Sequence, residues 1–128
     1  MNHMASELNF PDMSKQEFKV FNWLHKLKIR CIYQNPVFLY DEKNRPRVWT
    51  PDFYLPQLGI HIEVCGSKNF KYEYRDKIYK LNNIEVIFIH SYKPKNKWTT
   101  FFREKLRETE EKRRKNIDKL MEILPSKK

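Results

Sequence analysis

The segment from Ile60 to Cys65 constrains the fold of this chain more than any other stretch, because apolar and polar residues alternate along it. One side of the repeat carries Ile60, Ile62 and Val64, and the other carries His61, Glu63 and Cys65. A period of two predicts a β-strand with one apolar face. The chain has only two glycines, and Gly59 and Gly66 directly flank this segment, where a reversal and a strand end need backbone freedom.

Helical and strand patterns alternate around this strand. Ser14 and Glu17 form a capping box at the start of a helix predicted over residues 14–28, and further helices are predicted over 70–81 and from Asn96 onward. Further strands are predicted over 31–33, 37–40, 47–55 and 84–89. Pro51 predicts an edge or a bend in the third of these, and the apolar run 84–89 predicts a strand in the middle of a sheet.

This order predicts an α/β fold with a mixed sheet flanked by helices and a basic C-terminal helix. We expect an N-terminal arm over residues 1–12, one domain over 13–106, and a basic helical extension over 107–128. Apolar residues resume helical spacing from Ile117 to Leu124 without an evident partner in the domain, which suggests a homodimer contact.

The net charge of +10 predicts a polyanionic partner, either nucleic acid or an anionic membrane surface. Residues 93–128 hold 13 basic and 6 acidic residues, so most of the surplus lies in the last third. No apolar run approaches the roughly 20 residues that span a bilayer, and the start of the chain lacks the pattern of a signal peptide. The expected location is therefore cytoplasmic, or the nucleoid if the source is bacterial or phage.

Asp52 and Glu63 are the candidate chemical pair. A reversal around Gly59 would place their two strands side by side, in a register that allows both carboxylates to share a face. Two adjacent carboxylates repel unless a cation lies between them, and Mg²⁺ prefers such oxygen ligands. The alternative is an unrelated turn acid and a cross-strand ion pair, with Arg47 or His61 as the partner.

The residues Thr50-Pro51-Asp52-Phe53-Tyr54-Leu55, followed by Ile62-Glu63-Val64-Cys65-Gly66, resemble the core motif of the PD-(D/E)XK, or restriction-endonuclease-like, nuclease superfamily. The resemblance covers residues 14–92. It implies a metal-dependent endonuclease acting on duplex or branched DNA, with Mg²⁺ as cofactor and Mn²⁺ as a substitute. Asp52 and Glu63 would then be metal ligands, together with the carbonyl of Val64.

The resemblance also assigns roles on the two helices. Glu17 matches an extra acid that many members place near the metal, although the capping box alone also explains it. Arg75 and Tyr79 stand one turn apart and resemble a polar-plus-tyrosine pair found beside the active site in some branches.

Cys65 departs from the motif, because it occupies the position of the usual lysine. A thiol is mostly neutral at pH 7 and cannot supply the cation. Three explanations are open: another lysine substitutes, metal and substrate suffice, or catalysis is lost. Lys68, Lys71 and Lys77 are candidate substitutes, and Lys77 is favoured as a catalytic residue because it lies on the helix predicted beside the site.

Other functional classes remain open at this point. Cys65 could act as a nucleophile with His61 or His90 as base, the fold could serve a non-catalytic nucleic-acid-binding module, or the chain could be a nuclease subunit active only within a recombination or transposition complex. The cations predicted to contact nucleic acid are Lys68, Lys71, Arg75, Lys93, Lys95 and Lys97.

Overall fold

The computed structural model describes residues 13–125, so that the predicted N-terminal arm lies outside the described residues. The chain separates into two compact units, one ending at Lys93 and the other beginning at Pro94. The elements in chain order are α2 (Lys15–Lys26), β1 (Ile32–Tyr33), β2 (Val37–Tyr40), β3 (Pro46–Trp49), β4 (Phe53–Leu55), β5 (Ile60–Val64), α3 (Glu73–Leu81), β6 (Val86–Ile89) and α4 (Lys95–Ile123).

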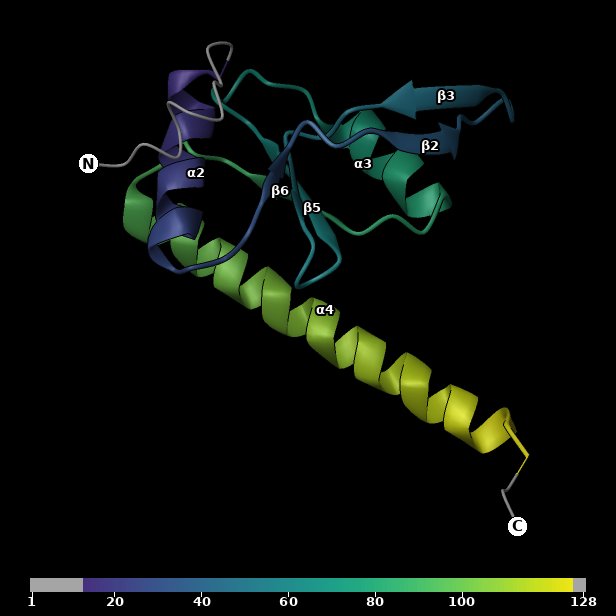
Figure 1. Ribbon diagram of the computed structural model, residues 1–128. Coiled ribbons are helices and arrows are strands. Elements are labelled where there is room, and N and C mark those ends of the chain that lie inside the picture. Colours follow the sequence, from purple (N-terminus) through teal and green to yellow (C-terminus); the bar gives the residue numbers. More distant parts are fainter. Residues whose placement is uncertain (1–12, 126–128) are drawn as a thin grey trace. The chain divides into compact units, whose positions relative to one another are not determined.

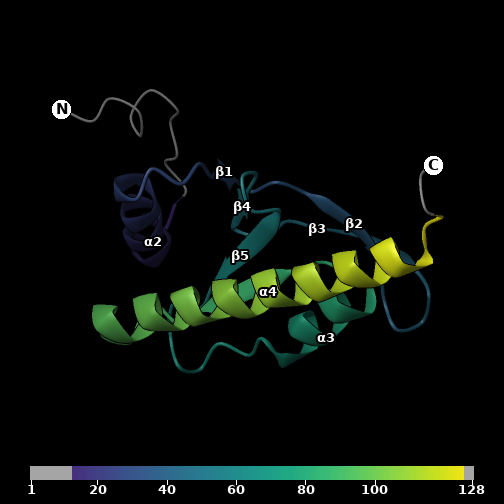
Figure 2. The same ribbon diagram turned by 90° about the horizontal axis from the view of Figure 1, so that it is seen from below.

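The first unit is built on a mixed four-stranded sheet in the order β1-β4-β5-β6. β4 pairs antiparallel with β1 and β5, whereas β5 and β6 are parallel and are connected through α3, the kind of crossover that a parallel pair needs. Helices α2 and α3 lie on either side of β5 (Figures 1 and 2). The predicted mixed α/β class, with a mixed sheet flanked by helices and a C-terminal helix, is therefore confirmed.

Strands β2 and β3 form a separate antiparallel hairpin beside α3 (Figure 1). Asn82, which follows α3, fixes this hairpin with a pair of hydrogen bonds to one residue. Its amide nitrogen donates to the carbonyl of Tyr40 at 2.8 Å, and its amide oxygen accepts from the Tyr40 N–H at 2.9 Å. The side chain of Asn82 thus replaces a neighbouring strand at this position of β2.

The predicted strand over residues 47–55 was wrong, because the structure divides it at Pro51 into β3 and β4, which belong to different sheets. Proline has no backbone N–H to continue a ladder, so the chain leaves one sheet here and enters the other. Asp52 stands directly after this break and next to the first residue of β4.

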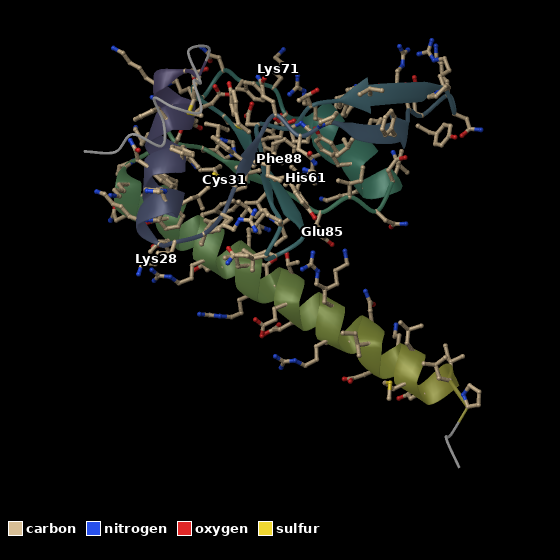
Figure 3. The ribbon with its side chains drawn as sticks, in the orientation of Figure 1. Lys28, Cys31, His61, Lys71, Glu85 and Phe88 are labelled. Atoms are coloured by element: carbon tan, nitrogen blue, oxygen red, sulfur yellow. The ribbon has the colours of Figure 1, made fainter. Side chains whose placement is uncertain are left out.

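Strand β5 has the predicted period of two, with Ile60, Ile62 and Val64 on its apolar face, and all five of its residues are buried. The second face is covered as well: the ring of His61 packs on Tyr54 with centroids 4.6 Å apart, and Glu63 is bonded to side chains of α3. Figure 3 shows His61 within the body of the first unit. Polar residues along a strand therefore do not identify a solvent face when a helix crosses over it.

Strand β6 occupies the end of the sheet order, which corrects the prediction of a central position. Its near-continuous apolar sequence is explained by packing instead. Phe88, labelled in Figure 3, belongs to a buried cluster whose other members are Leu39, Cys65, Ile78 and Tyr79. The preceding helix α3 begins at Glu73, three residues later than predicted.

The second unit contains α4, one continuous helix of 29 residues that runs through the predicted boundary between residues 106 and 107. Apolar side chains near its C-terminal end are exposed, namely Ile117, Leu120, Met121, Ile123 and Leu124. Across residues 13–125, none of the helices has the length and apolar character needed to cross a membrane.

Candidate active site

Asp52 is held by the backbone of the neighbouring strand. Its Oδ2 accepts a hydrogen bond of 2.7 Å from the N–H of Val64, the residue that follows Glu63 in β5. The antiparallel register, with Phe53 opposite Ile62, brings the residue before β4 to the far end of β5. The predicted convergence of Asp52 and Glu63 is therefore present in the structure.

Glu63 is almost fully buried, with 2% of its surface exposed, and is held by two side chains of α3. Its Oε2 accepts a bond of 2.7 Å from the hydroxyl of Tyr79 and one of 3.2 Å from Nη1 of Arg75. Arg75 and Tyr79 are four residues apart and so face the same way on the helix. Burial raises the pKa of Glu63, and the bonds from Tyr79 and Arg75 oppose this rise.

Glu17 forms the predicted capping box and also lies at the candidate site. The capping box is present, since Ser14 Oγ accepts from the Glu17 N–H and Glu17 Oε1 accepts from the Ser14 N–H at 2.8 Å. The hydroxyl of Tyr33 also donates to Oε1 at 3.2 Å. The same carboxylate lines a cavity with Asp52 and Glu63, so that capping α2 places an acid at the site.

This cavity has a volume of about 310 Å³. It is lined by Ser14, Gln16, Glu17, Asp52, Glu63, Val64, Gly66, Phe70 and Arg75. Four of these residues were not among the predicted site residues, namely Ser14, Gln16, Gly66 and Phe70. Gln16 lies one residue before Glu17 in α2, but no sequence pattern marks it as a site residue or separates Phe70 from an ordinary core aromatic.

The three carboxyl groups of Asp52, Glu63 and Glu17 lie close enough that ionisation of one disfavours ionisation of the others. Burial is the largest cause that raises the pKa of Asp52, to about 8, and a hydrogen bond with Glu17 and the charges of Glu63 and Glu17 add to it. The bond from the Val64 N–H acts in the opposite direction. Without a cation, burial and the neighbouring carboxylates therefore favour the protonated form of Asp52.

The donor atoms at this site are hard oxygens, contributed by the carboxylates of Asp52 and Glu63. Val64 bonds to only one oxygen of Asp52, namely Oδ2, and Tyr79 and Arg75 both bond to Oε2 of Glu63. These bonds leave the second oxygen of each carboxylate for a cation. Among residues 13–125, no group of three or more His, Cys, Asp and Glu side chains is arranged to hold a metal ion. A cation here would complete its shell with water and substrate oxygens, which is the usual habit of Mg²⁺.

Cys65 is fully buried in the cluster with Tyr79 and Phe88. Burial is the largest cause that raises the pKa of its thiol to about 12. The thiol is therefore neutral at physiological pH, and the hypothesis of a cysteine nucleophile is not supported by its environment. Burial also lowers the pKa values of His61 and His90.

The cation that lines the cavity is Arg75, whose side chain is 48% exposed. Lys77 lies on the exposed surface of α3, two residues from Arg75 and from Tyr79, and is absent from the cavity lining. Two residues along a helix turn a side chain to another face. Lys68 and Lys71 are exposed in the connection before α3, as Figure 3 shows for Lys71.

The remaining predicted contacts to nucleic acid are also exposed. Lys93 closes the first unit, whereas Lys95 and Lys97 belong to the first turn of α4. The ion pair considered for Arg47 with Asp52 or Glu63 is not formed, because Arg47 is bonded to Asp41.

Comparison with known proteins gives one structural likeness. No family model matches the sequence, and no curated protein matches it. Among solved structures, the chain is similar to the 5-hydroxymethylcytosine-specific restriction enzyme AbaSI, with a TM-score of 0.41 and 16% sequence identity. The match covers 89% of this chain and 45% of the AbaSI chain, so that the chain spans less than half the length of that enzyme.

Proposed function

We propose that this chain is a Mg²⁺-dependent endonuclease that hydrolyses phosphodiester bonds of DNA. The observation that supports this most directly is the pairing of Asp52 and Glu63 in one cavity, each held in place by a named donor. Carboxylates that are buried, adjacent and anchored are suited to hold a cation against phosphate oxygens.

Asp52 and Glu63 would hold the metal, with the Val64 carbonyl as a third contact. A bound Mg²⁺, for which Mn²⁺ would substitute, supplies Lewis acidity and neutralises charge on the phosphate group. The raised pKa of Asp52 fits this assignment, because a cation offsets the repulsion among Asp52, Glu63 and Glu17. Glu17 would bind water in the outer shell of the metal or contact it directly.

The residues around the pair orient it. The Val64 N–H fixes Asp52, and Tyr79 and Arg75 fix Glu63, so neither carboxylate is free to rotate away from the cavity. Arg75 uses one nitrogen for Glu63, and its guanidinium can also bind a phosphate oxygen. We assign to Arg75, rather than to Lys77, the positive charge that Cys65 cannot provide.

A second candidate function is a non-catalytic nucleic-acid-binding module on the same fold. The neutral, fully buried thiol of Cys65 favours it, because loss of one placed electrostatic stabiliser can cost about 10²–10³ in rate. A nuclease subunit that needs a recombination or transposition complex for activity would also bind DNA without cutting it alone.

The test is cleavage of supercoiled plasmid and branched oligonucleotides in Mg²⁺ or Mn²⁺. Asp52→Asn and Glu63→Gln keep the shape of each side chain, and Asp76→Asn on α3 removes an acid outside the cavity as a matched control. We expect metal-dependent cutting by the wild type and the control alone. Tight binding without cutting by the wild type would instead favour the binding module or a subunit that needs a larger complex.

We also propose a homodimer formed through the apolar stripe of α4. Ile117, Leu120, Met121 and Leu124 recur at helical spacing and are 56–67% exposed. An exposed apolar stripe of this kind is typical of an interaction surface. Two copies would supply two active sites, which is the simplest arrangement for cutting both strands.

A further inference from the structure

Two arginines at the end of the β2–β3 hairpin share one buried carboxylate. Nε of Arg45 and Nε of Arg47 lie 3.0 and 3.1 Å from Oδ2 of Asp41. The side chain of Asp41 is 2% exposed, whereas those of Arg45 and Arg47 are 53% and 46% exposed. The carboxylate is thus covered while both guanidinium groups face solvent.

The turn that carries these arginines is fixed by hydrogen bonds. Oδ1 of Asp41 accepts from the backbone N–H groups of Lys43 and Arg45 at 2.9 and 3.0 Å. The Asp41 N–H donates to the Arg45 carbonyl at 3.0 Å, and its carbonyl accepts from the Asn44 N–H at 2.9 Å. The backbone bond from Arg45 is the largest cause that holds the pKa of Asp41 well below its usual range. The arginines are therefore ordered before any ligand binds, which reduces the entropic cost of binding.

The charge and the free donors of this group suit a phosphate. One carboxylate and two guanidinium groups leave a net charge of +1. Each arginine donates to Asp41 through its Nε. Within residues 13–125, the Nη nitrogens of both arginines therefore remain for a ligand. Planar guanidinium groups match phosphate oxygens in both charge and geometry. The neighbouring acid Glu42 accepts a bond of 3.2 Å from Tyr74.

The hairpin is linked to the candidate active site through α3. Trp49 of β3 packs edge-on against Tyr79, with ring centroids 5.3 Å apart, and Tyr79 is bonded to Glu63. Asn82 and Tyr74 join the same helix to Tyr40 and Glu42 of the hairpin. A group bound at the arginines would therefore be held on the framework that also positions Glu63.

We propose that the arginine pair anchored by Asp41 binds phosphate groups of a nucleic-acid backbone and so fixes the register of the substrate on this unit. This inference rests on the proposed function for its choice of polymer. Binding here adds affinity without reading bases, because a phosphate contact carries no sequence information.

The first test measures oligonucleotide affinity by fluorescence anisotropy at several salt concentrations, in EDTA so that no cleavage occurs. The variant Arg45→Gln/Arg47→Gln is compared with Lys26→Gln/Lys28→Gln, which removes the same charge at the end of α2, away from the hairpin (Figure 3 labels Lys28). We expect the slope of log affinity against log salt to fall by about 0.9 for each lost contact to duplex phosphates. The control variant should retain the wild-type slope.

Arg45→Lys/Arg47→Lys separates lost charge from a damaged turn. Lysine keeps the positive charge, so this variant should have the wild-type slope of log affinity against log salt. Melting temperatures show whether each variant is folded. A slope for the glutamine variant equal to that of the control would overturn the proposal. So would a lysine variant that is folded and fails to restore the slope.

A second measurement needs no variant. The ¹⁵N resonances of Nε in Arg45 and Arg47 should shift when the wild-type chain is titrated with an oligonucleotide. Shifts with inorganic phosphate but none with the oligonucleotide would overturn the backbone assignment in favour of a small anion. The absence of shifts with both would overturn the site itself.

These outcomes are separable from the fate of the nuclease proposal. If the wild type cuts DNA and the glutamine variant keeps the wild-type salt slope, only the proposal of the arginine site is overturned. If the salt slope of the glutamine variant falls as expected but the wild type never cuts DNA with Mg²⁺, the arginine site is supported and the nuclease proposal is overturned. A wild type that binds no DNA at low salt overturns both.

Discussion

The hydroxyl of Tyr79 donates a 2.7 Å hydrogen bond to Oε2 of Glu63, which joins α3 to β5. Both residues are nearly inaccessible, at 1% and 2% exposure. Burial raises the pKa of Tyr79 far above its usual value, so that the phenol remains a neutral donor at every physiological pH. A buried carboxylate needs such a donor, because its desolvation is otherwise uncompensated.

Tyr79→Phe should lower the free energy of unfolding by about 1–3 kcal/mol, because a buried acceptor loses its bond while the ring stays in place. Urea unfolding measures this change. We also expect slower cleavage, since Glu63 is then held by Arg75 alone. Tyr72→Phe, in the same region of the core, is the matched control and should be close to wild type in cleavage. Equal stability and rate for Tyr79→Phe and the wild type would show that the bond does not hold Glu63.

Arg75→Gln should reduce the cleavage rate by about 10²–10³, the effect expected when a placed charge is lost from a site. Lys77→Gln removes the same charge from another face of α3 and should change the rate by less than about threefold. The measurement is single-turnover cleavage with saturating Mg²⁺. A large loss for Lys77→Gln with little loss for Arg75→Gln would return the role to the lysine.

Cys65→Lys, which places a lysine at the motif position, should destabilise the chain by several kcal/mol and should not increase cleavage. The thiol is completely buried against Tyr79 and Phe88, so a longer charged side chain both overpacks the core and buries a charge. Cys65→Ala should fold with a loss of about 1–2 kcal/mol and keep the wild-type rate. Thermal unfolding and cleavage are measured together. A stable Cys65→Lys variant with faster cleavage would show that the position has access to the cavity.

The local features of the site could be predicted from the sequence. Alternation from Ile60 to Cys65 and the turn at Gly59 define one hairpin, and its register brings Asp52 to Glu63. The capping box fixes where α2 begins and hence where Glu17 stands. Each of these depends on residues within about a dozen positions of one another, so that local rules suffice.

The features that the sequence could not predict depend on contacts between distant segments. The end position of β6 and the burial of His61 follow from which elements pack together, which a pattern along one strand does not contain. Lys77 was favoured from its position in the sequence alone. Helical periodicity already separates it from Arg75 and Tyr79, but only the fold shows that this face meets Glu63.

Leu120→Glu should convert the proposed dimer to a monomer, because it places a charge in the apolar stripe of α4, where Leu120 is 56% exposed. Lys119→Glu puts the same acid on a neighbouring face of the helix and should leave the oligomeric state unchanged. Sedimentation equilibrium of the full chain gives the answer. A wild type that is monomeric at high concentration would rule out the dimer.

Stability without metal should fall as pH rises from about 4 to about 8, because of Asp52. Its pKa is raised to about 8 in the folded chain from its ordinary value of 3.8, so within this window the folded state keeps a proton that the unfolded state has lost. Stability then decreases with pH, by the linkage between proton binding and folding. Asp52→Asn cannot ionise and should flatten this dependence in thermal unfolding measured with EDTA. Mg²⁺ should stabilise the wild type more at pH 8 than at pH 6, since a cation binds the ionised carboxylate. A pH profile identical in the wild type and Asp52→Asn would contradict the raised pKa.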